Sequence, residues 1–143
     1  MFIGEYTHAI DDKGRVSVPA KFRAKLQEGV VITRGLDHCL FIYPKKEWGT
    51  LAEKLSLLPL SQKQSRAFAR LMLSGAWDVE LDSQGRVMLP ASLRAYARLG
   101  KQVVITGLYN RLELWDEGAW LAYKQETEER SDDIAESMSA LGV

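Results

Sequence analysis

Two arginines, Arg15 and Arg86, carry the most specific chemistry in this 143-residue sequence. Each directly follows a glycine in an Asp-x-x-Gly-Arg motif, and the motif occurs twice, 71 residues apart. A guanidinium group presents a planar fork of N–H donors, which matches the oxygens of a phosphate or the O6 and N7 atoms of guanine. A long cation has no folding reason to recur just after a turn. The pattern therefore favours binding of a phosphate-bearing or nucleic-acid ligand.

The aspartates of the two motifs, Asp11 and Asp82, allow a structural interpretation of the same residues. A side-chain oxygen at this position typically accepts hydrogen bonds from backbone N–H groups ahead of it, which is a simpler role than a paired-carboxylate site. Each aspartate could also form a salt bridge with the arginine four residues later, contributing about 0–1 kcal/mol if exposed. The structural and binding roles are compatible, because an aspartate can orient a guanidinium that contacts a ligand.

Neighbouring basic residues distinguish the two copies of the motif. The first copy adds Lys13, Lys21 and Arg23 as candidate phosphate contacts, whereas Gln84 and Ser92 replace the two lysines in the second. Residues 1–71 carry 12 Lys/Arg and 7 Asp/Glu, and residues 72–143 carry the reverse. We therefore expect the loop that contains Arg15 to contribute more to ligand binding than the loop that contains Arg86.

An enzyme of this size normally shows a nucleophile, a general base or a set of metal ligands, and few candidates occur here. The candidates are His8, His38 and Cys39. His38 and Cys39 are adjacent, so on a strand they would point to opposite faces and could not form a nucleophile and base pair. There is no phosphate-binding motif of the G-x-x-x-x-G-K-S/T type. We expect no enzymatic activity, no metal and no cofactor.

The arginine motif lies within a longer internal repeat. In residues 10–23 and 81–94, seven of fourteen aligned positions are identical. The shared pairs are Asp11/Asp82, Gly14/Gly85, Arg15/Arg86, Val16/Val87, Pro19/Pro90, Ala20/Ala91 and Arg23/Arg94. The likeness continues in residues 30–33 and 103–106, and Trp48 corresponds to Trp120. A unit of about forty residues exposes too much apolar surface to be stable alone, so the two copies are expected to fold together.

Each repeat is predicted to fold as β-β-α-β-β. Two short strands around the Asp-x-x-Gly-Arg loop are expected to form a hairpin, with Gly14 or Gly85 at positive φ. Pro19 and Pro90 then begin short helices, which Gly29 and Gly100 end. The predicted hairpin strands are 6–10 with 16–18 and 79–81 with 87–89, the helices are 20–26 and 91–99, and the later strands are 30–33, 40–43, 103–106 and 112–115.

Further helices are predicted outside the repeated strands. Two of them, 46–58 and 61–73, lie between the repeats and are expected to cover a sheet; the second opens on a capping box at Ser61. Another begins near Asp116 and continues into an acidic tail. We divide the chain into a first unit (5–47), linking helices (48–75), a second unit (76–119) and a C-terminal helix with its tail (120–143), all within one compact domain.

Composition fits a globular protein, since 46% of the residues are hydrophobic. No apolar run approaches the roughly twenty residues that a membrane span requires, and the first residues lack the pattern of a signal peptide. The single cysteine cannot form an internal disulfide, which fits a reducing compartment. We expect a cytoplasmic protein.

Several segments of the sequence resemble the MraZ family, and the resemblance covers essentially the whole chain. The segments are 1–6, 10–23, 33–40, 43–48 and 110–115. The resemblance implies an α+β fold, mainly β, in which two tandem SpoVT-AbrB-like units form a swapped-hairpin barrel with covering helices. It also implies that Asp11, Arg15, Asp82 and Arg86 contact DNA.

The resemblance further implies a function. MraZ proteins are bacterial transcriptional regulators that form rings and bind repeats near the promoter of a division and cell wall gene cluster. We accordingly expect a nucleoid-associated repressor that binds double-stranded DNA as a homo-oligomeric ring, an octamer or a dodecamer. Ring neighbours related by rotation favour direct repeats about 10 bp apart. The alternative is an oligomeric scaffold that does not bind DNA.

Overall fold

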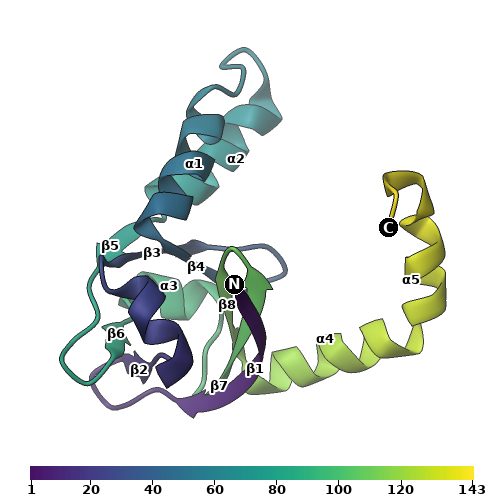
Figure 1. Ribbon diagram of the computed structural model, residues 1–143. Coiled ribbons are helices and arrows are strands. Elements are labelled where there is room, and N and C mark those ends of the chain that lie inside the picture. Colours follow the sequence, from purple (N-terminus) through teal and green to yellow (C-terminus); the bar gives the residue numbers. More distant parts are fainter.

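Strands from the two halves of the sequence interleave in one antiparallel sheet (Figure 1). The computed structural model describes residues 1–143. Six strands lie in the order β1-β7-β8-β4-β3-β5. Their bounds are Phe2–Ala9 (β1), Gln102–Tyr109 (β7), Leu112–Asp116 (β8), Leu40–Pro44 (β4), Val30–Arg34 (β3) and Trp77–Val79 (β5).

A separate two-stranded ribbon joins the repeated motifs. It consists of β2 (Arg15–Ser17) and β6 (Arg86–Met88), which pair antiparallel with Val16 opposite Val87 at the centre. Beyond the ribbon the backbone N–H of Val18 donates to the carbonyl of Gly85 at 2.9 Å, and the N–H of Leu89 donates to that of Gly14 at 2.8 Å. These matching bonds place an approximate two-fold axis through the centre of the ribbon.

The predicted hairpins are wrong about pairing, because each strand finds its partner in the other repeat. The loop itself closes as a turn, with the N–H of Asp11 donating to the carbonyl of Arg15 at 2.9 Å. Past the turn the strands diverge, since β1 pairs along its whole eight-residue length with β7 and β2 pairs with β6. A long ladder with β7 satisfies more backbone groups than the three residues of β2 could.

The mixed α+β class with mainly antiparallel strands is confirmed, but no closed barrel is found. The six-stranded sheet ends at two edges, β1 and β5, which do not pair with each other. Both faces of its central strands are nonetheless buried. One face belongs to a cluster of 18 buried residues, which also includes Val16 and Val87 of the ribbon. The other face contributes a smaller cluster around Phe41 and Trp115.

Each ribbon strand is followed by a short helical segment, as predicted. The first, η1 (Ala20–Leu26), is a 3₁₀ helix, and the second, α3 (Ala91–Tyr96), is an α-helix. Gly29 has φ +102° after η1, which fits its predicted place at the end of that segment. Gly100 does not have this role. The helix ends earlier because Arg98 takes the left-handed conformation at φ 52°, and the N–H of Leu99 donates back to the carbonyl of Arg94.

Five further helical elements complete the fold. Helices α1 (Lys45–Ser56) and α2 (Lys63–Ser74) form an antiparallel pair, here called the helical hairpin, whose base covers β3 and β4. Helices α4 (Glu117–Glu129) and α5 (Ser131–Ser137), with the short η2 (Ser139–Leu141), form an extended arm. The helical hairpin and the arm project from the body in different directions (Figure 1). None of the helices has the combination of length and apolar character that crossing a bilayer requires.

Two details of these helices were predicted, with different outcomes. The capping box at Ser61 is wrong: α2 begins two residues later, its N-cap is Gln62, and no side chain caps it. The correspondence of Trp48 and Trp120 holds structurally. Trp48 packs against Tyr43 at the start of α1, Trp120 packs against Trp115 at the start of α4, and both border the smaller buried cluster.

Candidate nucleic-acid interface

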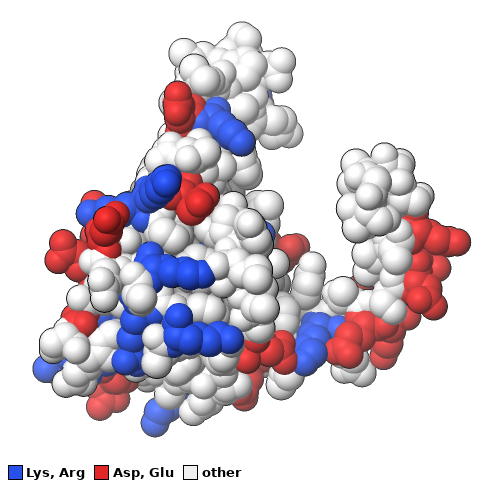
Figure 2. Space-filling view, viewed as in Figure 1, with Lys and Arg blue, Asp and Glu red and all other residues white.

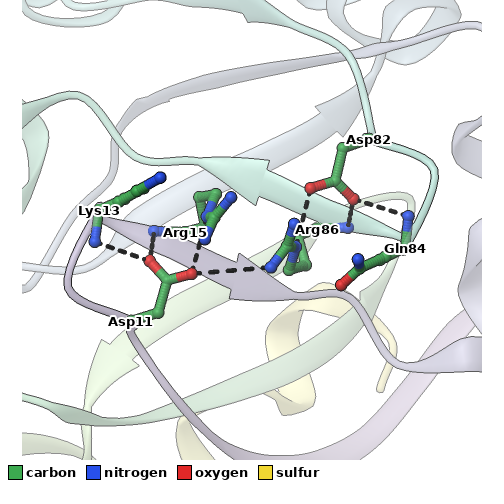
Figure 3. Close-up of polar contacts among 6 residues, drawn as sticks. All are labelled: Asp11, Lys13, Arg15, Asp82, Gln84 and Arg86. Atoms are coloured by element: carbon green, nitrogen blue, oxygen red, sulfur yellow. Dashed lines mark hydrogen bonds and ion pairs between the residues drawn. The ribbon is translucent and has the colours of Figure 1, made fainter.

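The ribbon formed by β2 and β6 brings the two motif arginines together. Because the strands run antiparallel with Val16 opposite Val87, Arg15 and Arg86 lie on the same short ribbon, on either side of its centre. Figure 3 shows the two guanidinium groups side by side, with Asp11 and Asp82 outside them. The sequence repeat is therefore a spatial pair, and the exchange of strands between the repeats creates it.

The first loop holds Arg15 through a single carboxylate. One oxygen of Asp11, Oδ1, accepts the backbone N–H groups of Lys13 and Arg15, both at 2.9 Å. The other oxygen, Oδ2, accepts Nε of Arg15 at 2.7 Å. The predicted hydrogen bonds from the loop backbone and the predicted salt bridge are thus both present. Gly14 has φ +80°, as the turn was predicted to require.

The second loop repeats this geometry almost atom for atom. Asp82 Oδ1 accepts the N–H groups of Gln84 and Arg86 at 2.9 Å, and its Oδ2 accepts Nε of Arg86 at 2.8 Å. One contact breaks the symmetry, because Nη1 of Arg86 also lies 3.9 Å from Oδ2 of Asp11 (Figure 3). Arg86 therefore lies near two carboxylates and Arg15 near one.

The electrostatics of the loops keep both aspartates ionised. Backbone N–H groups and then the guanidinium of Arg15 lower the pKa of Asp11 below its ordinary value of 3.8, and the equivalent groups lower that of Asp82. The arginine side chains remain about one-quarter exposed, at 28% and 24%. In each case Nε is held by aspartate, while the terminal amino groups make no hydrogen bond within the chain.

This arrangement suits end-on recognition of a ligand with two acceptors. A guanidinium with Nε fixed has lost most of its rotational freedom, so less side-chain entropy is lost when its terminal edge binds. The terminal amino groups can form two parallel hydrogen bonds to a phosphate or to a guanine edge. Two such groups on one ribbon offer a pair of these contacts at a fixed spacing.

Arg23 and Arg94 each lie against the turn glycine of the other repeat's loop, Arg23 against Gly85 and Arg94 against Gly14. A Cβ added at Gly85 would overlap Nε of Arg23, and one added at Gly14 would meet Cζ of Arg94 at 3.2 Å. Nε of Arg23 donates to the carbonyl of Val18 at 3.0 Å, which fixes the guanidinium in place. Arg23 was predicted as a phosphate contact, and its guanidinium lies against Gly85 in the turn of the opposite loop. The matching position of Arg94 in the repeat was the signal that it has the same role.

The predicted lysines differ in their placement. Lys13 is exposed within the first loop, and its ammonium group has no partner in the chain. Lys21 lies on η1, where its ammonium group is 5.1 Å from the centre of the Tyr6 ring, and no polar contact connects it to either loop. Of the candidate cations, the structure therefore groups Arg15, Arg86 and Lys13 on the loops and leaves Lys21 on the neighbouring helix.

The candidate nucleophile lies elsewhere and is enclosed. His38 and Cys39 follow β3 in a tight turn and are not on a strand as supposed, and His38 has φ 61°. Cys39 is fully buried, and its thiol lies 3.1 Å from the carbonyl oxygen of Leu36. Burial raises the pKa of the thiol far above its ordinary range, which opposes formation of a thiolate.

Known proteins resemble this chain over its full length. The sequence matches the family model described as "MraZ protein, putative antitoxin-like" twice, over residues 1–71 and 72–141. It is 51% identical to the transcriptional regulator MraZ of Halothermothrix orenii over 143 residues, which is 100% of both chains. The proteins of the same name from Desulfitobacterium hafniense and Alkaliphilus oremlandii are 50% and 51% identical, also over 100% of both chains.

Proposed function

The chain belongs to the MraZ family, and from this premise we propose that it is a transcriptional regulator that binds DNA through the loops of its β2–β6 ribbon. Its relatives are named transcriptional regulators, which supports regulation of transcription as the general role. The loops supply the specific mechanism. In this proposal Arg15 and Arg86 contact base edges or phosphates, and Asp11 and Asp82 orient them.

The observation that supports this proposal best is that the guanidinium groups of Arg15 and Arg86 are each held by a hydrogen bond at Nε only. Each has Nε bound to aspartate, and the terminal amino groups of each make no hydrogen bond within the chain. A purely structural salt bridge would not require the same side chain twice on one exposed ribbon. Arginine bound to the O6 and N7 atoms of guanine is the most frequent specific contact in the major groove. The major groove also admits a two-stranded β-ribbon, which is the element that carries both arginines here.

The test is the replacement of one guanidinium at a time. Arg15→Ala is expected to weaken binding to the DNA upstream of the protein's own gene by about 1–3 kcal/mol, or roughly 5- to 150-fold, in fluorescence anisotropy at fixed salt. Arg86→Ala is expected to have a smaller effect. Lys46→Ala, which removes an exposed cation on α1, is the control and should bind like the wild type.

Salt dependence separates contacts to phosphates from contacts to bases. If one copy neutralises about three phosphates, the log–log slope of its affinity against salt is about −2.7. Lys13→Ala is expected to make this slope shallower by about 0.9 without changing the preferred sequence. A salt-independent affinity, or wild-type binding by Arg15→Ala, would contradict the proposal and favour a scaffold that does not bind DNA.

The finer parts of the proposal follow from family membership. We propose that the protein acts in the cytoplasm at the nucleoid, represses its own division and cell wall gene cluster, and forms a ring on direct repeats about 10 bp apart. Neighbouring copies on one duplex would bind at high effective concentration, which compensates for the few contacts that each copy makes. Deletion of the gene is then expected to raise transcription of the cluster, and footprinting should show protection at the spacing of one helical turn.

A further inference from the structure

The arm extends away from the sheet with little to stabilise it. Helix α5 is seven residues long and packs mainly against its neighbours α4 and η2. Isolated helices shorter than about 12–15 residues are marginal in water. The base of the arm, by contrast, is fixed to β1, because Glu5 accepts Nε1 of Trp120 at 2.9 Å and Nζ of Lys124 at 2.6 Å. The base of the arm is thus held in place, and its end is free to contact another chain.

The arm and the helical hairpin carry opposite charges. Residues 57–76, which include α2, contain three basic residues and no acidic ones, namely Lys63, Arg66 and Arg70. The arm contains two basic and seven acidic residues, and the acidic ones are Glu117, Glu126, Glu128, Glu129, Asp132, Asp133 and Glu136. Figure 2 shows acidic side chains gathered along the arm. Only Glu126 of these acids forms a salt bridge within the chain, at 3.9 Å to Arg130.

Both projections also expose apolar side chains. On the helical hairpin Leu57 is 77% exposed and Leu60 is 83% exposed. On the arm Leu121 is 55% exposed and Leu141 is 73% exposed. Leu57 and Leu60 lie close in sequence at the tip of the helical hairpin, whereas Leu121 and Leu141 lie in different helices of the arm. Exposed apolar surface of this kind can mark a contact with another protein. The helical hairpin and the arm thus both expose apolar side chains, and their charges are opposite in sign.

A groove at the base of the arm provides a third part of this surface. It has a volume of about 320 Å³ and is lined mainly by apolar and aromatic side chains, including Leu36, Leu108, Trp120 and Tyr123. Its wall also contains Arg111, which binds the largely buried Glu113 at 3.0 Å. The groove lies where α4 leaves the sheet, so it is continuous with the arm.

Comparison of the two repeats shows that the arm cannot cover its own sheet as α2 does. Between α1 and α2 the chain has six residues in which to reverse, whereas only Arg130 separates α4 from α5. In the first repeat the hydroxyl of Thr33 donates to the carbonyl of Met72 on α2 at 2.6 Å. The equivalent hydroxyl of Thr106 is buried without any partner. The second repeat therefore lacks a helix that the first one has.

We propose that the helical hairpin of one copy docks against the arm and the groove of a second copy. The basic face of α2 then lies along the acidic arm, and the apolar tip around Leu57 and Leu60 meets apolar side chains of the arm and groove. The two surfaces are different, so the contact is head-to-tail and every copy offers both halves. This inference deepens the ring of the proposed function and rests on that assembly, but it does not depend on DNA binding.

The first experiment reverses charges on the full-length protein. Lys63→Glu with Arg70→Glu is the test variant, because neither side chain has a polar partner within the chain. The variant is expected to shift from the oligomer to a monomer of 16.1 kDa in size-exclusion chromatography with light scattering. Lys13→Glu with Lys21→Glu changes the net charge equally. This control is expected to keep the oligomer mass and to lose DNA affinity.

The second experiment restores complementarity. Glu126→Lys with Glu129→Lys and Asp133→Lys reverses the arm and is expected to give a monomer on its own. Mixing this arm variant with the hairpin variant restores the contact in both directions. The acidic hairpin of one variant meets the basic arm of the other, and the unchanged basic hairpin meets the unchanged acidic arm. The mixture is therefore expected to regain the wild-type oligomer mass through alternating variants, whereas each variant alone stays at 16.1 kDa. A mixture that stopped at dimers would indicate an isologous contact and overturn the head-to-tail arrangement, and a mixture that stayed monomeric would overturn the charge pairing of the two surfaces.

Each result separates the possible failures. Circular dichroism checks that the variants are folded, and the single substitutions Lys63→Gln and Arg70→Gln give graded losses if a charge-reversed pair fails to fold. A wild-type monomer would overturn both the ring and this interface. A wild-type oligomer that both reversals leave intact would overturn the interface alone. Loss of DNA binding by the loop variants bears only on the proposed function.

Discussion

Replacing Gly85 with alanine is expected to destabilise the protein more than the same change at Gly14, although the two glycines are equivalent in the repeat. Both have positive φ, at 75° and 80°, so a Cβ at either position is strained. The surroundings differ. The added Cβ at Gly85 would overlap Nε of Arg23, whereas the one at Gly14 would lie 3.2 Å from Cζ of Arg94.

The expected magnitudes follow from these distances. The left-handed conformation costs a residue with a Cβ about 1–2 kcal/mol, which applies to both variants. At Gly14 the arginine must move by only a few tenths of an ångström. At Gly85 it must leave its place, and the loss of its hydrogen bond to Val18 adds about 1 kcal/mol. We therefore expect a loss of about 1–2 kcal/mol for Gly14→Ala and about 2–3 kcal/mol for Gly85→Ala.

The assay is urea unfolding followed by tryptophan fluorescence, at one fixed protein concentration because assembly contributes to stability. Gly49→Ala is the control, since Gly49 lies in α1 with no atom within 4 Å of the added Cβ. This variant is expected to be more stable by about 0.5–1 kcal/mol. Equal losses at Gly14 and Gly85 would refute the argument from Arg23, and no loss at either would refute the argument from φ.

Three further predictions concern buried and charged groups. Thr33→Val leaves the carbonyl of Met72 on α2 without its donor and is expected to lower the free energy of unfolding in urea by about 1–3 kcal/mol. Thr106→Val removes a buried hydroxyl that has no partner, so it is expected to be neutral or stabilising by about 1 kcal/mol. The opposite order of stabilities would contradict the hydrogen-bond assignment. Glu113→Ala leaves a guanidinium and an indole N–H without their acceptor and is expected to cost about 2 kcal/mol, and a change within error of zero would count against this pairing. The folded pKa values of Asp11 and Asp82 lie below 3.8. The stability that these carboxylates contribute is therefore present above about pH 3.8 and is lost as the pH falls through the folded pKa. Carboxyl carbon chemical shifts that titrate at or above pH 3.8 would contradict this.

Local features of the fold were predictable from the sequence, and the partners of the strands were not. The turn glycines, most strand segments and the short helices after Pro19 and Pro90 follow from local propensity and appear as expected. Two strands are displaced from their predicted bounds: the one predicted at 79–81 is β5 at Trp77–Val79, and the one predicted to begin at residue 6 is β1, which begins at Phe2. Pairing depends on residues far apart in the sequence, and the repeat offers each strand two similar partners. The structure selects β7 for β1, about a hundred residues away. Arg98 in place of Gly100 at the end of α3 shows that tertiary context also overrides the usual C-terminal signal.

Half of the candidate site was likewise visible in the sequence. The spacing of Asp11 and Arg15 predicted a salt bridge and backbone hydrogen bonds, because all the atoms belong to one loop. The contact between Arg23 and Gly85 and the ion pair between Arg86 and Asp11 join different repeats, so no local spacing indicates them. Identity at equivalent positions of the repeat was the only signal for Arg94.

The pairing of β1 with β7 sets the order in which a nascent chain can fold. Strand β1, Phe2–Ala9, is synthesised well before its partner Gln102–Tyr109, and β2 likewise precedes β6. At about 5–20 residues per second, the hundred residues between them take about 5–20 s to synthesise. Throughout this interval the strand edge and its apolar side chains lack their partners, which is the condition under which unpaired strands aggregate. Duplication of the motif within one chain thus gives the two loops a fixed spacing. It also means that β1 and β2 stay unpaired during translation until β6 and β7 have been synthesised.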